Sequence, residues 1–101
     1  MVEILENSSG EYQLHFKSSN GNLLLKSVSF KNEAEAKGVL NQTFSNPIFE
    51  RTTDHQGKFI IHLKTKTGER VGQSNTYSSE AGMENGIKNL KETILRNKQN
   101  R

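Results

Sequence analysis

The sequence contains no cysteine, no tryptophan and a single proline, and only 31% of its 101 residues are hydrophobic. The absence of cysteine excludes disulfide bridges and thiolate metal sites, and it is compatible with a reducing compartment. No apolar run approaches the length that spans a membrane, and residues 1–10 lack the basic and apolar segments of a signal peptide. We therefore expect one cytoplasmic domain with a modest hydrophobic core and no membrane partner.

The net charge of +3 could indicate an acidic partner, so its location matters. Residues 1–83 hold equal numbers of basic and acidic side chains, and the whole excess lies in residues 84–101. A weak nucleic-acid interface on a basic C-terminal helix and tail is one interpretation. The simpler one is that cations favour a helix C-terminus and a solvated end. The basic residues concerned are Lys88, Lys91, Arg96, Lys98 and Arg101.

The sequence matches itself when it is shifted by 47 residues. The matched positions include glycines, histidines, lysines and apolar residues in the same order. A repeated unit in one short chain predicts two similar substructures related by a pseudo-two-fold axis. The matched pairs include Gly10/Gly57, Tyr12/Phe59, Leu14/Ile61, His15/His62, Phe16/Leu63, Lys17/Lys64, Gly21/Gly68, Ser27/Ser74 and Phe30/Tyr77.

Each repeat begins with a pattern that predicts three strands. In residues 11–18 apolar and polar side chains alternate, which is typical of a strand with one buried and one solvated face. Asn20-Gly21 then predicts a tight hairpin turn, because both residue types tolerate positive φ. We expect strands at 2–5, 11–18 and 22–27, and equivalent strands at 48–52, around 59–63 and at 69–74.

A helix follows the strands in each repeat. Asn32 is a favourable N-cap with Glu35 three residues later, and Asn46-Pro47 ends the first helix. Ser79 caps the second, longer helix. Apolar residues at helical spacing give each helix one stripe that a sheet face must cover. These stripes are Ala36, Leu40 and Phe44 in the first helix, and Met83, Ile87, Leu90 and Ile94 in the second.

These elements predict an α+β fold of two β-β-β-α repeats, at 2–46 and 48–95, followed by a polar tail at 96–101. The economical arrangement is one six-stranded, mainly antiparallel sheet with both helices on one face. The link at Asn46-Pro47 is too short to join independent domains. One question stays open: Gly38 matches Gly86 only if one residue is skipped, whereas Ala36 matches Met83 without a skip.

The chain resembles the YegP-like family of small tandem-repeat proteins. The family motif is a glycine, alternating aromatic and apolar residues, then Asn-Gly, a serine-ended strand and a helix carrying Asn-Gly-Ile. Its counterparts here are residues 10–21 and 27–30 in the first repeat, and 57–68, 74–77 and 85–87 in the second. Thr67 departs from the motif, which has asparagine before the glycine. The resemblance implies a single duplicated sheet with strands exchanged between the repeats, and it implies no activity.

The alternating pattern leaves one sheet face open, and this face is the candidate binding surface. We expect Gln13, His15, Lys17, Ile60, His62 and Lys64 to lie on it. We also expect both histidines to be exposed and to titrate near the ordinary histidine pKa of about 6.5. If the pseudo-two-fold axis passed near them, two imidazoles could approach each other and bind a metal. A metal site needs further ligands, however; we expect no carboxylate to alternate with the histidines on that face, and the neighbouring lysines disfavour a cation.

No catalytic, cofactor-binding or metal-binding signature is present in the sequence. Asp54-His55 is better explained as a turn, and the glycines are not spaced as a phosphate-binding loop. We therefore predict a non-enzymatic protein without a cofactor, which binds a protein partner or a second copy of itself through the open face, with Ile60 as an apolar centre. Tyr12, Phe16 and Phe59 are predicted to point into the core, which makes RNA stacking on that face unfavourable.

Overall fold

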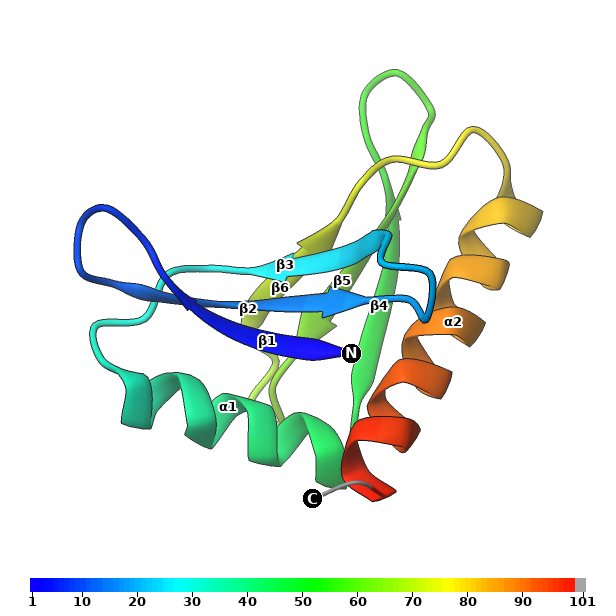
Figure 1. Cartoon of the computed structure of the whole chain (residues 1–101). Helices are drawn as coiled ribbons and strands as arrows, with labels where there is room; N and C mark the ends of the chain where they lie inside the picture. The colour runs from blue at the N-terminus through cyan, green and yellow to red at the C-terminus, as the bar shows by residue number, and fades with distance from the viewer. Residues whose placement is uncertain (100–101) are drawn as a thin grey trace.

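The computed structural model describes residues 1–99 and contains a β-β-β-α unit twice (Figure 1). The prediction of an internally duplicated α+β fold is confirmed. The first unit consists of β1 (Val2–Glu6), β2 (Tyr12–Lys17), β3 (Leu23–Ser27) and α1 (Glu33–Ser45). The second consists of β4 (Ile48–Thr53), β5 (Phe59–Lys64), β6 (Arg70–Ser74) and α2 (Glu80–Gln99).

All six strands form one antiparallel sheet in the order β1-β2-β3-β6-β5-β4. The implied exchange of strands between repeats is wrong, because each repeat keeps its own three strands as consecutive neighbours. Short turns and loops hold each set of three together, so within the sheet the two repeats meet along β3 and β6. The outer strands β1 and β4 are the two edges of the sheet.

The join between β3 and β6 contains the pseudo-two-fold axis. Lys26 pairs with Gln73, and these two residues are also equivalent under the 47-residue shift. A pair of equivalent residues facing each other across an antiparallel ladder lies on the local symmetry axis. The strands of the two repeats are therefore arranged symmetrically about the Lys26–Gln73 pair.

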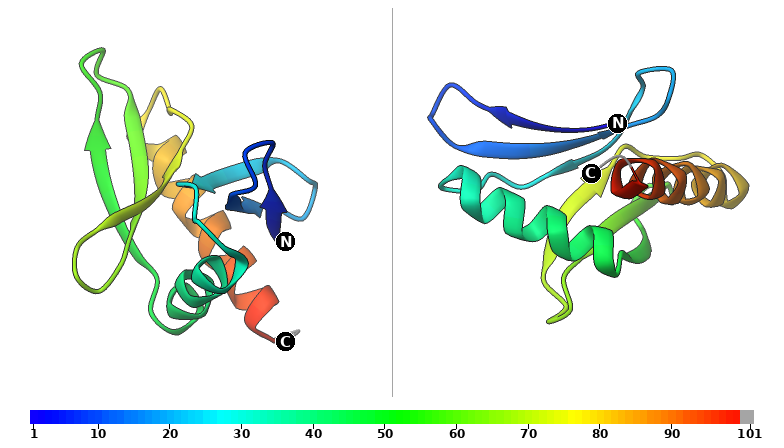
Figure 2. Two further views of the ribbon diagram at one scale, coloured as in Figure 1. Left: turned by 90° about the vertical axis from the view of Figure 1, so that its left-hand side faces the viewer. Right: turned by 60° about the horizontal axis from the view of Figure 1, so that its bottom comes forward.

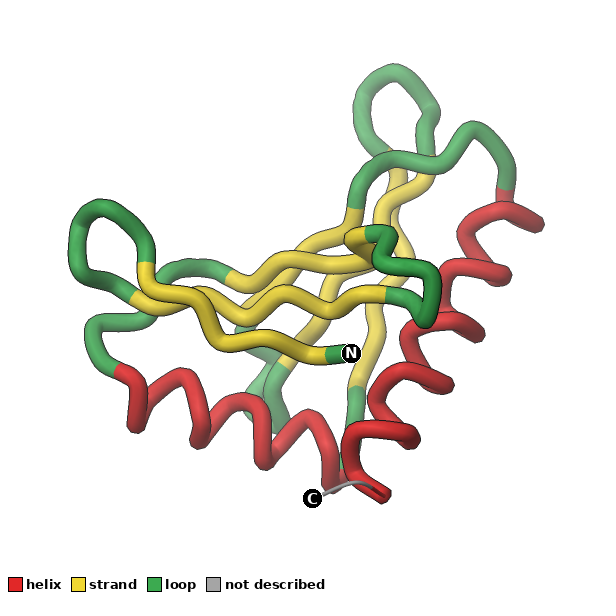
Figure 3. Tube along the Cα trace, viewed as in Figure 1, coloured by secondary structure: helices red, strands yellow, loops and turns green. Residues whose placement is uncertain are grey.

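Both helices pack on one face of the sheet, as predicted (Figures 1 and 3). The buried side chains of α1 and α2 join those of β2, β3 and β5 in one cluster. Since the core residues of each strand alternate with polar ones, the opposite face is left without a helix. The buried apolar residues are Leu14, Phe16, Leu25, Phe30, Ala36, Phe44, Ile61, Leu63, Val71, Met83, Ile87, Leu90 and Ile94.

The hairpin turns differ from the predicted two-residue type. The N–H of Gly21 donates to the carbonyl of Ser18 (3.0 Å), and Gly21 alone has positive φ in this turn. The equivalent turn bonds Gly68 to Thr65 (3.0 Å), and Gly68 has the same φ of 87°. The residue before each glycine has negative φ, so Thr67 is as well suited to its turn as an asparagine.

The helix caps follow the prediction. The side chain of Asn32 accepts a hydrogen bond from the N–H of Glu35 (2.8 Å), and the Oγ of Ser79 accepts one from Gly82 (3.0 Å). Ala36 and Met83 are both buried, so the alignment without a skipped residue is the structural one. Gly86 packs against the Tyr77 ring, whereas nothing lies near a Cβ built on Gly38.

The two repeats are not identical at the symmetry axis. Leu25 is buried, and Gly72 occupies the equivalent position in β6. A Cβ on Gly72 would lie 2.6 Å from Cδ2 of Leu25. The single leucine therefore fills the space near the axis that two equivalent large side chains could not share.

Helix α2 continues through Gln99, so residues 96–99 of the expected polar tail are helical. Asn97 is held in place: its Oδ1 accepts from the N–H of Val2 (3.1 Å), and its Nδ2 donates to the carbonyl of Thr93 (2.8 Å). Thr93 also donates to the carbonyl of Lys17 (3.0 Å). The C-terminal part of the helix is thus fastened to the first repeat, and residues 100–101 lie outside the described part.

Candidate functional site: the open sheet face

One row of side chains crosses the entire open face. The strand registers place Glu3 opposite His15, His15 opposite Lys26, and Lys26 opposite Gln73. The row continues from Gln73 to His62 and ends at Glu50. Its order is therefore glutamate, histidine and lysine in the first repeat, and glutamine, histidine and glutamate in the second. The pseudo-two-fold axis lies at its centre.

The glutamates at the two ends were missed by the sequence analysis. They lie on β1 and β4, beside rather than along the histidine strands, so the alternation within one strand does not reveal them. The internal repeat contained the signal, because the 47-residue shift also pairs Glu3 with Glu50. The expectation that this face has no carboxylate near the histidines is wrong.

Both glutamates are paired with cations from other strands of the sheet. Oε1 of Glu3 lies 2.6 Å from Nζ of Lys17, and Oε1 of Glu50 lies 2.7 Å from Nη2 of Arg70. Lys64 approaches Glu50 at 3.6 Å. The hydrogen bond from Lys17 lowers the pKa of Glu3, and that from Arg70 lowers the pKa of Glu50. Both carboxylates are therefore ionised and neutralised at neutral pH.

His62 is buried, with only 7% of its surface exposed, so the prediction that it is exposed is wrong. Arg70 on β6 must cross β5 to reach Glu50 on β4, and this ion pair covers the strand that carries His62. Nε2 of His62 lies 2.9 Å from the hydroxyl of Thr52. Burial lowers the pKa of His62, and the charge of Arg70 adds to that shift. The imidazole is therefore neutral at neutral pH.

His15 is partly buried, and its Nε2 is a buried atom without a hydrogen-bond partner. The reason is a difference between the repeats: Leu5 stands where the second repeat has Thr52. Burial also lowers the pKa of His15, with Lys26 and Lys17 adding to the shift. The expectation that the two histidines keep the ordinary pKa of an exposed imidazole is wrong for both.

The two imidazoles do not approach each other. His15 and His62 are separated by β3 and β6, and three strand spacings amount to about 14 Å. In the described residues 1–99, no group of three or more histidine, aspartate and glutamate side chains could hold a metal ion. The histidine pair cannot form a shared metal site.

A groove of about 470 Å³ lies at the centre of the open face, along β3 and β6. Its walls combine exposed apolar side chains with amides and cations. Leu23 is 38% exposed and Val28 is 49% exposed. The groove is lined mainly by Leu23, Lys26, Val28, Arg70, Gln73 and Asn75.

The six predicted surface residues contribute unequally to this face. Gln13, His15 and Lys17 alternate with the core residues of β2, and Ile60, His62 and Lys64 alternate with those of β5, as expected. Of the six, only His62 lines the central groove. Ile60 is partly buried and does not line this groove.

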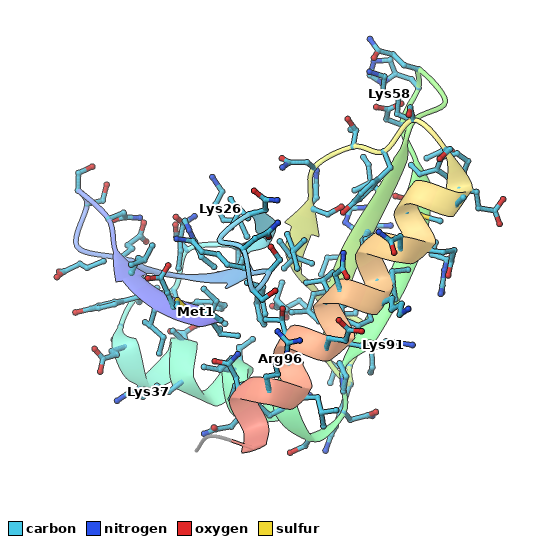
Figure 4. All side chains as sticks on the ribbon, turned by 45° about the vertical axis from the view of Figure 1, so that its right-hand side comes forward. Met1, Lys26, Lys37, Lys58, Lys91 and Arg96 are labelled. Atoms are coloured by element: carbon cyan, nitrogen blue, oxygen red, sulfur yellow. The ribbon has the colours of Figure 1, made fainter. Side chains whose placement is uncertain are left out.

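The basic side chains of α2 lie on a different part of the surface. Figure 4 labels Lys26 on the sheet and Lys91 and Arg96 on the last helix. Lys88, Lys91 and Arg96 are exposed, and Glu84 and Glu92 lie on the same helix. This is the mixed charge of a solvated helix surface.

The geometry defines an internally duplicated α+β domain with one helix-covered and one open sheet face (Figure 2). The chain belongs to the UPF0339 family, which includes the YegP proteins. It is 31% identical over 96 residues to the UPF0339 protein in the ptx operon 5′ region of Stutzerimonas stutzeri, covering 88% of this chain and 84% of that one. Residues 54–95 match the domain of unknown function DUF1508.

Solved structures have the same fold. The solution NMR structure of UPF0339 protein SO3888 from Shewanella oneidensis has a TM-score of 0.85 and 26% identity, over 92% of this chain and 82% of that one. YegP from Escherichia coli has a TM-score of 0.84 and 24% identity, over 93% and 84%. YegP is described there as a protein of unknown function. Family and fold are thus established, and any function has to be argued from the surface.

No helix among residues 1–99 is both long and apolar enough to cross a membrane.

Proposed function

We propose that the protein is a cytoplasmic, non-enzymatic binding module that holds an acidic segment of a protein partner against its open sheet face. The central groove between β3 and β6 carries this proposal. It lies on the pseudo-two-fold axis, where the two repeats contribute side chains to one surface. The absence of cysteine agrees with a cytoplasmic location.

Charge favours an acidic partner. On this face Lys17, Lys64 and Arg70 are each paired with a glutamate of the same face. Lys26 forms no ion pair within the described residues, and it lies at the centre of the groove. An incoming carboxylate would find an unpaired ammonium group there, and such complementarity sets specificity and association rate.

The apolar walls favour a polypeptide over a small anion. Leu23 in β3 and Val28, the residue after this strand, are exposed large hydrophobic residues on either side of Lys26. An extended segment with alternating acidic and apolar residues could place its carboxylates near Lys26 and its apolar side chains on these two. The amides of Gln73 and Asn75 add hydrogen-bonding groups at the opposite wall.

Two other classes of function have less support. A nucleic-acid surface of this type needs stacking platforms, and Phe16 is buried in the core while Tyr12 and Phe59 pack against it. A catalytic role for the histidines is not favoured either. Both have a lowered pKa, and His62 is covered by the pair of Glu50 with Arg70.

The proposal can be tested by NMR titration of the full chain with an acetylated peptide of alternating glutamate and leucine. We expect saturable amide shifts confined to β3 and β6. Lys26→Glu should weaken binding by about tenfold or more, equal to about 1.4 kcal/mol. The matched control is Lys91→Glu, which makes the same charge change on α2 and should leave the affinity within about twofold.

The same variants separate the alternatives. Binding of a short oligothymidylate that is steeply salt-dependent and lost in Lys91→Glu would support the nucleic-acid function of the C-terminal helix instead. Shifts spread over the helices, or equal losses in Lys26→Glu and Lys91→Glu, would refute docking at the groove.

A further inference from the structure

The edge strand β1 has backbone groups that point away from the sheet. The backbone N–H and carbonyl of Tyr12 are both hydrogen-bonded to Phe30 (2.9 and 2.7 Å). Glu6, which lies opposite Tyr12 in the β1–β2 register, therefore makes no backbone hydrogen bond to Tyr12. Met1 and Lys17 bond to each other at the other end of the strand (2.8 and 2.7 Å). Alternation along an antiparallel pair then directs the backbone groups of residues 2, 4 and 6 outward.

The outward groups form a self-complementary set. The N–H of Val2 is already bonded to Asn97. The outward N–H donors that remain belong to Ile4 and Glu6, and the carbonyls of Val2 and Ile4 face the same way. In a second copy placed antiparallel about Ile4, each Ile4 would donate to its counterpart. Each Glu6 would donate to the other copy's Val2, so all of these donors find an acceptor.

The side chains agree with this register. Ile4 would meet Ile4 of the second copy on the helix side, next to a groove of about 340 Å³ that Leu40 and Phe44 line. On the open face Glu3 would lie opposite Leu5, so no carboxylates would face each other directly. A register centred on Glu6 would oppose two glutamates, and one centred on Val2 would require the N–H that Asn97 occupies.

The other edge of the sheet is protected. Arg51 in β4 is the counterpart of Ile4, and its Nη2 donates to Oε1 of Glu84 in α2 (3.0 Å). Arg51 and Glu84 both line a groove of about 380 Å³. In this groove Ile87 and Lys91 stand at the positions equivalent to Leu40 and Phe44 of the first repeat. Self-pairing centred on Arg51 would oppose two guanidinium groups, and charged residues on an edge strand discourage such pairing.

We propose that the protein forms a symmetric dimer in which the β1 edges of two copies pair antiparallel about Ile4, giving one continuous twelve-stranded sheet. The join would repeat, between chains, the type of contact that β3 and β6 make within the chain. Because only one edge is available, the assembly closes at two copies rather than growing into a fibre. This surface is separate from the groove proposed for an acidic partner.

Sedimentation equilibrium of the full chain from micromolar to millimolar concentration tests the dimer. The average mass should rise from the monomer value of 11.4 kDa toward twice that value. Glu6→Pro removes one outward N–H without removing a bond to β2, and proline is tolerated at such an edge position. It should weaken dimerisation by at least about tenfold. The matched control is Thr53→Pro, at the equivalent position of β4, which should dimerise like the wild type.

A second measurement does not depend on the folding of a variant. In a mixture of isotope-labelled and unlabelled wild-type chains, intermolecular NOEs should connect the two copies of Ile4, and Val2 with Glu6. A monomer at millimolar concentration, a dimer equally weakened by both proline variants, or intermolecular NOEs at the open face would each overturn the proposal.

Discussion

The contact between Leu25 and Gly72 predicts a large effect of a very small substitution. Gly72→Ala adds one methyl group, which would lie 2.6 Å from Cδ2 of Leu25 and 3.4 Å from Cβ of Leu63. Leu25 is only 1% exposed, so its methyl group cannot move into solvent. Overpacking of this kind costs about 1–3 kcal/mol. For a domain of this size, that loss lowers the melting temperature by about 4–8 °C per kcal/mol.

The cause can be isolated with a double-mutant cycle. Leu25→Ala alone should cost about 2–5 kcal/mol, because it leaves a cavity at the sheet join. In Leu25→Ala/Gly72→Ala the added methyl group enters that cavity. The double variant should therefore lose about 1–2 kcal/mol less than the sum of the two single variants. Urea unfolding followed by circular dichroism gives these free energies, provided that the m-value is unchanged.

Gly38→Ala is the matched control for this cycle. Nothing lies within 4 Å of a Cβ built on Gly38, and the residue is exposed in α1. The same substitution should therefore stabilise the protein there, by up to about 1 kcal/mol, because alanine favours a helix. If Gly72→Ala lies within about 0.5 kcal/mol of the wild type, or if the double variant is additive, the steric argument is wrong.

Three further outcomes are expected. Thr52→Val should cost about 1–3 kcal/mol in urea unfolding, because it leaves Nε2 of the buried His62 without a partner; a change below about 0.5 kcal/mol would contradict this. Burial lowers the pKa of His15 and His62 in the folded state. Their contribution to the free energy of unfolding should therefore be complete above about pH 6.5 and should decrease as the pH falls below that value. Replacing both by glutamine should flatten this slope below about pH 6.5, and an unchanged slope in the double variant would contradict the argument. Neither half of a chain cut near Asn46 should show a cooperative thermal transition as a monomer, since β3 and β6 would lose their shared ladder.

The local structure could be predicted because each signal lies within a few neighbouring residues. Alternation along β2 identified a strand and its buried face, and Asn32 with Glu35 identified the start of α1. The turn type was wrong, and so was the end of α2, which continues to Gln99. Asn-Gly is compatible with positive φ at both residues, but here the turn places that requirement on Gly21 alone.

The composition of the open face could be predicted only in part. The alternation assigned His15 and His62 to this face, but their burial depends on side chains from other strands. The pair of Arg70 with Glu50 spans three strands, so the sequence spacing of its members carries no direct information about it. The central groove was missed for a related reason. It depends on β3 lying beside β6, whereas the family resemblance implied a different strand order.

The hydrogen bonds of α2 to the first repeat also constrain the order in which the native contacts can form during synthesis. Thr93 bonds to Lys17, and Asn97 bonds to Val2, across 76 and 95 residues of chain. During synthesis the first repeat emerges from the ribosome well before these partners exist. The strands of the first repeat therefore cannot complete their hydrogen bonds with α2 until that helix has been synthesised.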